Sequence, residues 1–367
     1  MNDSHPKPAA APQAPALVTV AQLAEFDEVI DVRSEAEYAE DHVPGAVNCP
    51  VLDNAERARV GTLYKQVSAF AAKRIGAALV SRNIARHLET SFADRPRDWR
   101  PLVYCWRGGT RSGAFAHVLN QVGWRAGRLD GGYKAYRRAV TADLAHIPDR
   151  LRWRVVCGLT GSGKSRFLHA LAECGAQVLD LETLAAHRGS VLGDLPGQPQ
   201  PSQKMFESLL WFELRRSAST QPTYVEAESR KIGNLRVPQT LIEAMWRSEC
   251  VCLDTGTALR VEFLKQEYRH FLLDPVLLGS QLGCLVARHG AQQIAAWTAL
   301  AAGQRWDELV RDLLERHYDP AYTRSTLKNY PGCREAPRLE VDGASDAAFV
   351  RLAQQCLVRG NCRATHK

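Results

Sequence analysis

The chain has 367 residues, of which 45% are hydrophobic and 24% are charged. At about 150 residues per domain, this length predicts two domains with ample material for buried cores. No uncharged apolar run approaches the roughly 18 residues of a membrane helix, which argues against a membrane protein. Residues 1–16 are rich in Ala and Pro and lack the apolar region of a signal peptide, so they are expected to form a disordered tail. We therefore expect a cytoplasmic protein without a membrane partner.

The net charge of +7 is unevenly distributed along the chain. From Lys73 to Arg154 there are 17 Lys and Arg against 6 Asp and Glu, a surplus of +11, so the remaining residues carry −4. A strongly basic segment in a slightly acidic protein favours a polyanionic partner such as a nucleic acid. A solvated basic face would give the same charge, and composition alone leaves both interpretations open.

The ten cysteines are scattered along the chain without a CxxC pair. Disulfide frameworks are typical of short secreted chains, and structural zinc sites usually show closely spaced ligands. We therefore expect neither a disulfide framework nor a metal site. Most of the cysteines are expected to be small buried apolar residues in a reducing compartment.

Strands and helices alternate in the first half of the chain. The short apolar runs Glu28–Val32 and Leu102–Tyr104 predict buried strands. A helix is predicted after the second strand because apolar residues recur at helical spacing, at Phe115, Val118, Leu119 and Val122. Gly123 stands where a helix is expected to end. This order predicts a parallel α/β domain over residues 17–140.

A second α/β unit begins with the predicted strand Trp153–Cys157, which a Gly-rich loop and a helix stopped by Gly175 follow. Further strands are predicted at Pro222–Glu226 and Cys250–Leu253, and Val191–Pro201 is predicted to be an exposed loop. From Ala291 onward the pattern is mostly helical. We predict a P-loop domain over residues 141–290 and a helical extension of it over residues 291–367.

Cys105 stands between a predicted strand and a predicted helix, in a loop that can bind an anion. The loop residues are Trp106, Arg107, Gly108, Gly109, Thr110 and Arg111. Glycines allow several backbone N–H groups to point at one centre, and the following helix adds its positive N-terminal end. Together with the two arginines, these groups favour the thiolate, so Cys105 is predicted to have a lowered pKa and to act as a nucleophile.

The sequence around this loop resembles rhodanese-like domains, first in Asp31–Pro50 and again in the closing segment Leu129–Arg137. Rhodaneses carry sulfur or selenium on such a cysteine. The C-x5-R spacing from Cys105 to Arg111 also describes the cysteine phosphatases, some of which share the rhodanese-like fold. Loop length therefore leaves a sulfur or selenium transferase and a phosphatase both open.

A phosphate-binding loop follows the strand that ends at Cys157, because residues 158–165 satisfy GxxxxGK[ST] between a strand and a helix. The predicted phosphate-binding residues are Gly158, Gly161, Ser162, Gly163, Lys164 and Ser165. Backbone N–H groups and Lys164 would bind a di- or triphosphate, and Ser165 could hold Mg²⁺. The motif specifies a polyphosphate and does not specify its hydrolysis.

Polar residues near the ends of later strands could complete this site. They are Asp180, Glu182, His187, Arg188, Glu226, Glu228, Ser229 and Arg230. A carboxylate on a second strand could hold Mg²⁺, but each carboxylate could equally cap a helix or face solvent.

Six blocks of the chain resemble the tRNA 2-selenouridine synthase family: residues 56–70, 104–113, 158–165, 180–190, 225–233 and 318–322. The resemblance runs from about residue 25 to about residue 325. It departs from the family pattern at Ala227, where an acidic residue is expected. Residues after Tyr330 carry no block that matches the family.

The resemblance implies an α/β transferase that replaces sulfur by selenium at C2 of the wobble 2-thiouridine of tRNA. Selenophosphate would donate selenium, and geranyl diphosphate would first alkylate the sulfur to give S-geranyl-2-thiouridine. The partners implied are tRNA, bound through its anticodon arm, and an enzyme that supplies selenophosphate. No tightly bound cofactor is implied.

The same resemblance suggests roles for particular residues. Cys105 would handle selenium, either as a perselenide or by assisting its delivery, and Arg107 and Arg111 would hold the selenophosphate oxygens. Trp106 would stack on an unpaired base or simply pack. Our hypothesis for Lys164 is that, with the loop N–H groups, it stabilises departing pyrophosphate.

Two alternatives from other classes stay open at this point. The first is a rhodanese-fold cysteine phosphatase or sulfurtransferase fused to a nucleotide-binding module. The second is a non-enzymatic, nucleotide-gated RNA-binding protein, which would leave a reactive cysteine unexplained.

Overall fold

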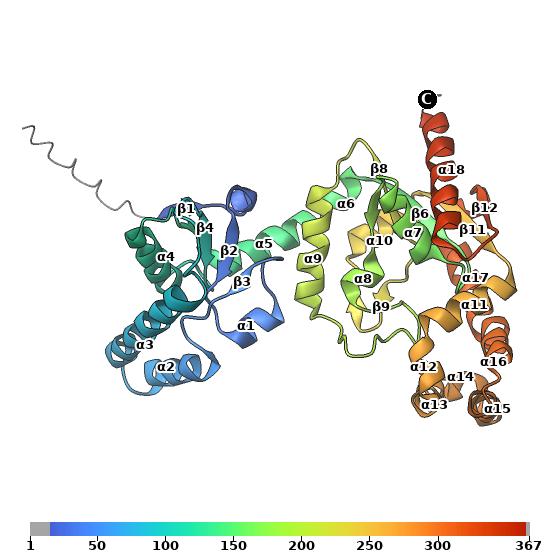
Figure 1. The fold of residues 1–367 in the computed structure, drawn as a ribbon, viewed down its shortest axis with the longest axis horizontal. Helices are drawn as coiled ribbons and strands as arrows, with labels where there is room; N and C mark the ends of the chain where they lie inside the picture. Colours follow the sequence, from blue (N-terminus) through green and yellow to red (C-terminus); the bar gives the residue numbers. More distant parts are fainter. Residues whose placement is uncertain (1–14, 365–367) are drawn as a thin grey trace, which may run out of the picture. The chain divides into compact units, whose positions relative to one another are not determined.

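The computed structural model describes residues 15–364. It divides into two compact units, the first comprising the residues up to Asp143 together with Glu207–Leu209, and each unit contains one five-stranded parallel sheet (Figure 1). The predicted tail, residues 1–16, lies outside the described residues except at its end, where the strand that begins at Ala16 corrects the predicted boundary. No helix among the described residues is long and apolar enough to cross a membrane.

The sheet of the first unit has the strand order β1-β5-β4-β2-β3. Its strands are β1 (Ala16–Val18), β2 (Glu28–Asp31), β3 (Val47–Asn48), β4 (Pro101–Tyr104) and β5 (Gly127–Leu129). Every residue of β4 is buried, and Cys105 follows its last residue. The strands predicted from apolar runs at 28–32 and 102–104 are therefore confirmed, and Cys105 lies at the carboxyl end of the sheet.

The helices of the first unit are η1 (Val20–Glu25), α1 (Glu35–Glu40), α2 (Asn54–Gln66), α3 (Ala69–Thr90), α4 (Thr110–Val122) and α5 (Gly132–Leu144). Helices α3 and α4 contribute Ile84, Phe115 and Leu119 to the core that covers β2 and β4. Helix α4 ends as predicted at Gly123, whose φ of 111° suits glycine. Helices α2 and α3 pack against each other and form most of the segment between Pro50 and Pro101.

The sheet of the second unit has the order β12-β11-β6-β8-β7. Its strands are β6 (Arg152–Cys157), β7 (Gln177–Leu179), β8 (Pro222–Glu226), β11 (Glu249–Thr255) and β12 (Arg338–Val341), and β9 (Lys231–Ile232) pairs with β10 (Leu235–Arg236) in a separate small sheet. The central strand β6 leads directly into the phosphate-binding loop, so residues 158–165 lie at the carboxyl edge beside the ends of β8 and β11.

Helices surround this second sheet and continue beyond it. They are α6 (Ile147–Arg150), α7 (Lys164–Glu173), α8 (Leu181–Ala185), α9 (Gln203–Arg216), α10 (Gln239–Trp246), α11 (Thr257–Glu267), α12 (Arg269–Leu273), α13 (Pro275–Gly283), α14 (Val286–His289), α15 (Ala291–Ala302), α16 (Trp306–Leu313), the π-helical η2 (Leu314–Tyr318), α17 (Asp319–Asn329), η3 (Pro331–Arg334) and α18 (Asp346–Ala364). Apolar residues of α12–α16 form their own core around the fully buried Trp297.

The predicted helical extension over residues 291–367 needs a correction. Residues 338–341 form β12, which pairs with β11 and completes the sheet. Helix α18 then packs on α7, where Phe349 and Ala353 join Phe167 in one core. The continuous helical segment also begins earlier than Ala291, at α11. The last described part of the chain therefore belongs to the P-loop domain itself.

The segment Val191–Pro201 is mostly exposed, as its Gly and Pro residues predict, except at Leu192 and Gly193, which are buried. Leu192 is buried in the core of α12–α16. The segment is thus anchored to the helical part of the second unit by one apolar side chain.

Candidate active sites

Cys105 lies in a loop that stabilises its thiolate. Its Sγ is 3.2 Å from the Oγ of Ser112, on the first turn of α4, and backbone N–H groups of Arg107 and Ser112 also point at it. Burial by itself would raise the pKa of the Cys105 thiol, but these hydrogen bonds and the charge of Arg111 outweigh it and lower the pKa. Ser112, which the sequence reading missed, is therefore part of the site.

The shape of this loop depends on two close backbone approaches. Gly108 has a φ of +64°, and a Cβ there would lie 2.7 Å from the carbonyl oxygen of Leu129. A Cβ on Gly132 would lie 2.3 Å from the carbonyl oxygen of Cys105. Glycine is required at both positions because any side chain would push the loop away from the start of α5.

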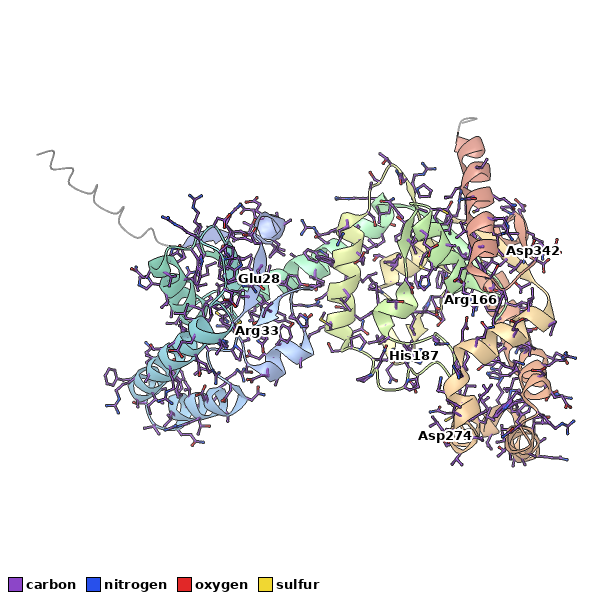
Figure 2. The ribbon with its side chains drawn as sticks, viewed as in Figure 1. Glu28, Arg33, Arg166, His187, Asp274 and Asp342 are labelled. Atoms are coloured by element: carbon purple, nitrogen blue, oxygen red, sulfur yellow. The ribbon has the colours of Figure 1, made fainter. Side chains whose placement is uncertain are left out.

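Aromatic and ionic contacts support the loop that contains Cys105. The N–H of Tyr133 donates to the carbonyl oxygen of Cys105 over 2.8 Å, and its ring stacks on Trp106 with centroids 5.2 Å apart. The ring of Tyr133 also lies 4.0 Å from the guanidinium carbon of Arg33, which is almost fully buried and ion-paired with Asp31. Figure 2 labels Arg33 within the first unit. Trp106 is thus engaged in packing, which was one of the two roles considered for it.

The two arginines of the loop differ in their surroundings. Arg107 is exposed, whereas Arg111 is half-buried and its Nη1 lies 3.3 Å from Oε2 of Glu37. The same Glu37 oxygen is 2.8 Å from Nε of Arg57. The Glu37 pairing orients Arg111 while leaving other guanidinium N–H groups to bind an oxyanion.

The phosphate-binding loop has the residues expected of it, arranged around the end of β6. Gly158, Gly161 and Gly163 all have positive φ, and a Cβ at the last two would collide with side chains of α11 and α18. Lys164 is buried, and its Nζ donates to the carbonyl oxygens of Gly158 and Leu159 over 3.0 and 3.3 Å. The buried Oγ of Ser162 has no hydrogen-bond partner among the described residues, so a polar acceptor or donor is missing at this position.

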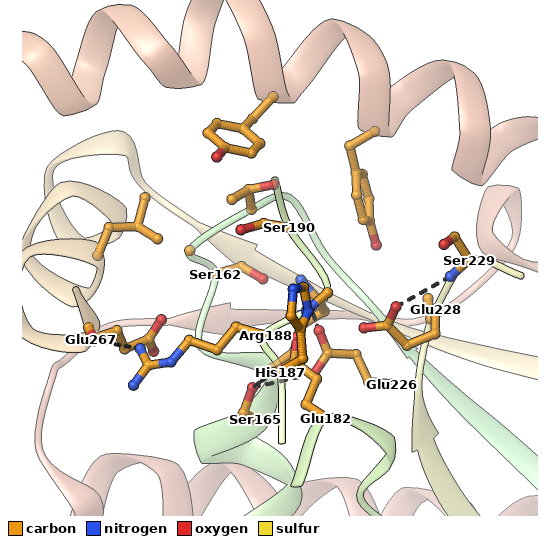
Figure 3. Close-up of a pocket in the computed structure, with 18 of the residues that line it drawn as sticks. Ser162, Ser165, Glu182, His187, Arg188, Ser190, Glu226, Glu228, Ser229 and Glu267 are labelled. Atoms are coloured by element: carbon orange, nitrogen blue, oxygen red, sulfur yellow. Dashed lines mark hydrogen bonds and ion pairs between the residues drawn. The ribbon is translucent and has the colours of Figure 1, made fainter. Parts of the chain in front are cut away.

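Three carboxylates meet beside Ser165 and Lys164. Oxygens of Glu182, Glu226 and Glu228 lie within 4.8 Å of one another, and Oγ of Ser165 is 3.3 Å from both Glu182 and Glu226 (Figure 3). Burial and mutual repulsion raise the pKa of Glu182 and of Glu228, the latter to about 8, and burial raises the pKa of Glu226 although Lys164 opposes this. A set of carboxylate oxygens with a serine hydroxyl suits Mg²⁺, which would also relieve their repulsion.

Residues 187–190 lie directly beside these carboxylates, since a Cβ on Gly189 would lie 2.8 Å from Oε1 of Glu228 and 3.1 Å from Oε1 of Glu182. Arg188 donates to the carbonyl oxygen of Glu267 and lies over the ring of Tyr268 at 5.1 Å. The N–H of Gly189 donates to Nδ1 of His187 over 3.0 Å, and burial lowers the pKa of His187. Both side chains line the same cavity of about 640 Å³ as the phosphate-binding loop.

Two of the predicted polar residues have other contacts. Asp180 caps α8 by accepting hydrogen bonds from the N–H and the hydroxyl of Thr183, although it still lines the cavity. Arg230 is exposed and lies over the ring of Trp246 at 4.8 Å, outside the cavity lining. Ser229 lines the cavity, and its N–H donates to Glu228. The structure therefore joins Glu182, His187, Arg188, Glu226, Glu228 and Ser229 around the phosphate-binding loop and places Arg230 elsewhere.

The segment Tyr318–Tyr322 contributes directly to the phosphate-binding loop. The hydroxyl of Tyr322 accepts a hydrogen bond from the N–H of Gly158 over 2.9 Å, and its ring lies 5.3 Å from Nζ of Lys164. Asp319 forms a bidentate pair with Arg260, whose Nε donates to the carbonyl oxygen of Thr160. The sequence marked this segment by its family resemblance, but no local pattern indicated its place beside the loop.

A narrow apolar pocket adjoins the phosphate-binding cavity. Thr160, Leu264, Tyr268 and Tyr318 line both spaces. The remaining lining of the apolar pocket comes from residues 192, 265, 271, 272, 278, 306, 309, 310, 313 and 314, of which only Lys265 is charged. An occupant with an anionic head and a short apolar tail would match the two spaces together.

The fold and its two sites define a class of protein in which a rhodanese-like domain with a reactive cysteine precedes a P-loop domain. Residues 18–139 match the family model for a rhodanese-like domain, and residues 151–283 match that for a tRNA 2-selenouridine synthase AAA domain. Both matched ranges agree with the two units of the structure.

Three relatives, each named tRNA 2-selenouridine synthase, are similar to most of the chain. The protein of Aeromonas salmonicida is 34% identical over 323 residues, which cover 80% of this chain and 86% of the relative. That of Pseudomonas putida is 31% identical over 355 residues, 88% of this chain and 93% of the relative. That of Nitrosomonas europaea is 35% identical over 244 residues, 65% of this chain and 63% of the relative. The chain belongs to the tRNA 2-selenouridine synthase family.

Proposed function

We propose that this protein is a transferase that exchanges sulfur for selenium at C2 of the wobble 2-thiouridine of tRNA, in two half-reactions. Geranyl diphosphate would alkylate the sulfur at the P-loop domain, and selenium from selenophosphate would replace the alkylated sulfur with the help of Cys105. Family membership supports the overall reaction. The observation that carries the first half-reaction is the apolar pocket that opens beside the phosphate-binding loop.

Geranyl diphosphate combines the two properties that these adjoining spaces select. Its diphosphate would bind the N–H groups of residues 158–165 and Lys164, and the first carbons of its apolar chain would enter between Leu264 and Tyr318. The apolar pocket holds about 60 Å³, so it has to widen toward the core of α12–α16 to take the whole chain. A nucleoside triphosphate would instead present a polar sugar and base to this apolar lining, at the cost of unpaired polar groups. We therefore assign the phosphate-binding loop to the prenyl diphosphate.

The carboxylates would repel a bare diphosphate, so a cation belongs in this proposal. Ser165, Glu182 and Glu226 offer oxygens that fit Mg²⁺, together with diphosphate oxygens. Bound Mg²⁺ would neutralise charge on the diphosphate. Lys164 and the loop N–H groups would then stabilise the leaving pyrophosphate as the sulfur of 2-thiouridine bonds to C1 of the geranyl group and the C–O bond breaks. The uridine N3 proton leaves in the same half-reaction.

Any role proposed for Cys105 must be consistent with the oxidation state of selenium in selenophosphate. Selenium in selenophosphate is already reduced to the level of selenide, so a perselenide on Cys105 would require an oxidant. The C-x5-R loop instead suits attack of the thiolate on phosphorus: the S–P bond forms, the P–Se bond breaks, and hydroselenide leaves with the electron pair. Water then hydrolyses the S–P bond to phosphate, while hydroselenide attacks C2 of the alkylated uridine and geranylthiol departs.

The tip of the α2–α3 hairpin, residues 64–74, offers a surface for tRNA in the first unit. Tyr64, Val67 and Phe70 are exposed there to 59%, 67% and 76%. Lys65, Lys73 and Arg74 are exposed on the same tip. Exposed aromatic rings among cations suit stacking on unpaired bases and contact with phosphates.

A double replacement, Tyr64→Ala with Phe70→Ala, tests this surface. We expect it to weaken tRNA binding about ten- to hundredfold, from the loss of one or two stacking contacts at about 1–3 kcal/mol each. Binding of geranyl diphosphate should not change. Val122→Ala, which alters another exposed apolar residue of the first unit, is the control. Unchanged tRNA affinity in the double variant would exclude the hairpin tip as a contact.

The overall function is tested on tRNA from cells that lack this protein, complemented by the wild type or by Cys105→Ser. Mass spectrometry of the digested nucleosides identifies the modification of the wobble uridine. We expect the wild type to restore 2-selenouridine and Cys105→Ser to accumulate S-geranyl-2-thiouridine. If the wild type restored no 2-selenouridine, the proposal would fail. Incubation of the protein with selenophosphate alone, followed by intact mass measurement, distinguishes phosphocysteine from perselenide by the selenium isotope pattern.

A further inference from the structure

Three cysteines from distant parts of the chain meet in the second unit. Cys157 ends β6, Cys252 lies beside it in register on β11, and Cys333 belongs to η3. Their Sγ atoms all lie within 4.8 Å of one another. Because Val251 and Leu253 face the core with α7 and α18, the alternation along β11 places Cys252 on the opposite face of the sheet.

Ordinary packing of neutral thiols does not account for this arrangement. The Sγ atoms of Cys252 and Cys333 are 2.7 Å apart, closer than the ~3.5–4.0 Å at which non-bonded heavy atoms rest. A small buried space needs only one polarizable side chain to fill it, and here three elements each supply a sulfur atom. One pair is thus closer than neutral thiols rest, and the Sγ of Cys157 lies within 4.8 Å of both.

We propose that Cys157, Cys252 and Cys333 form a binding site for one thiophilic metal ion, with zinc the expected occupant. Tetrahedral Zn²⁺ with bonds of about 2.3 Å holds its sulfur ligands about 3.8 Å apart, and this separation falls within the observed cluster. The Cys252–Cys333 pair would open by about 1 Å when the ion enters. Binding displaces the thiol protons to solvent, so the site carries metal-bound thiolates.

The fourth ligand position also has a candidate. Cys250 precedes Cys252 by two residues and so lies on the same face of β11. It is buried, and its Sγ lies 3.5 Å from the position that a Cβ on Gly332 would occupy, which places it against η3. Its Sγ lies outside the 4.8 Å cluster and donates to the carbonyl oxygen of Ser248 over 3.7 Å, so it would have to turn toward the ion to close the coordination shell as in structural zinc sites.

The proposed metal site would stabilise the position of the phosphate-binding loop. Cys157 directly precedes Gly158. The helix before η3 is α17, and its Tyr322 accepts a hydrogen bond from the N–H of Gly158. Tyr330, at the start of η3, donates its hydroxyl to the carbonyl oxygen of Glu228 over 2.6 Å. A metal ion bound to β6, β11 and η3 would therefore fix the loop, Tyr322 and the segment after β8 that carries Glu228 in one arrangement.

The test is the metal content of the full chain, purified without a metal-chelating tag and under reducing conditions. Inductively coupled plasma mass spectrometry should find about one zinc per chain in the wild type. Cys333→Ser and Cys252→Ser should each lose at least tenfold in zinc content. Cys284→Ser, at an exposed cysteine, is the matched control and should retain it.

Titration of metal-free wild type with Co²⁺ keeps the proposal testable if the variants fail to fold. Thiolate-to-cobalt charge-transfer bands that saturate at one ion per chain, and that Zn²⁺ then removes, would support it. Absence of zinc as purified together with no cobalt binding after reduction would overturn it. A mass of the intact protein that is two hydrogens lower, with two thiols unreactive until reduction, would show that Cys252 and Cys333 form a disulfide and would overturn the metal site.

Discussion

Lys164→Ala separates the two half-reactions most sharply. In the structure Nζ of Lys164 donates to two carbonyl oxygens of the loop and lies 3.5 Å from Glu226. When a diphosphate binds, these donors can turn to its oxygens. Two charge-assisted hydrogen bonds at about 1.5–3 kcal/mol each amount to about 3–6 kcal/mol. We therefore expect geranylation to slow about a hundredfold to ten-thousandfold.

The assay starts from two different tRNAs. With 2-thiouridine tRNA and geranyl diphosphate, Lys164→Ala should show the full loss. With tRNA that is already geranylated and selenophosphate, it should act like the wild type, and Cys105→Ser should show the opposite pattern. Lys231→Ala, which removes an exposed cation outside the cavity lining, is the control for net charge. Geranylation by Lys164→Ala within about threefold of the wild type would refute the assignment of the phosphate-binding loop to the prenyl diphosphate.

Three further outcomes follow from the contacts described above. Ser112→Ala removes a hydrogen bond that stabilises the Cys105 thiolate, so the pKa of the thiol should rise and the alkylation profile should move to higher pH. Glu228→Gln should flatten the pH dependence of thermal stability measured without Mg²⁺. The pKa of Glu228 is raised on folding from 4.5 to about 8, so the folded protein binds the extra proton and loses stability as the pH rises through this window, by up to about 1.4 kcal/mol per unit. Phe349→Ala should cost about 3–5 kcal/mol of unfolding free energy in denaturant titrations, because this fully buried ring packs on Gly163 and Phe263.

Each of these measurements has a control in the same chain. Ser81→Ala, at an exposed serine of α3, should leave the alkylation profile unchanged. Added Mg²⁺ should stabilise the wild type more at pH 8 than at pH 6, since the carboxylates must be ionised to bind it. Val358→Ala, on the exposed side of α18, should change stability by less than about 0.5 kcal/mol. Equal destabilisation by Phe349→Ala and Val358→Ala would contradict the place of α18 in the core.

What the sequence predicted correctly depends on short-range patterns. The strands at 28–32 and 102–104, the helix end at Gly123 and the phosphate-binding loop all follow from residues that are neighbours in the chain. The strand β12 escaped prediction although its four residues alternate between polar and buried apolar side chains, because so short a run becomes a strand only through its pairing with β11.

The candidate sites, too, could be predicted only where their residues are neighbours in the chain. The thiolate loop of Cys105 could be recognised because its glycines and arginines are contiguous. The hydrogen bond from the N–H of Gly158 to the hydroxyl of Tyr322, by contrast, joins residues that are 164 positions apart in the chain. The cysteine cluster is hidden for the same reason, since its members come from β6, β11 and η3. Asp180 caps α8, one of the roles left open for these carboxylates, and it also lines the cavity.

The pairing of β12 with β11 has a consequence for how the protein is made. On the ribosome the first unit is complete except for Glu207–Leu209 once residues up to Asp143 have emerged, and domains fold as units from the N-terminal side during synthesis. The second sheet has to wait for residues 338–341, and α7 waits for its partner α18. A transcript truncated shortly before these codons would yield a chain with a folded cysteine domain and an unfinished phosphate-binding domain, in which the apolar face of α7 is open to chaperones and proteases.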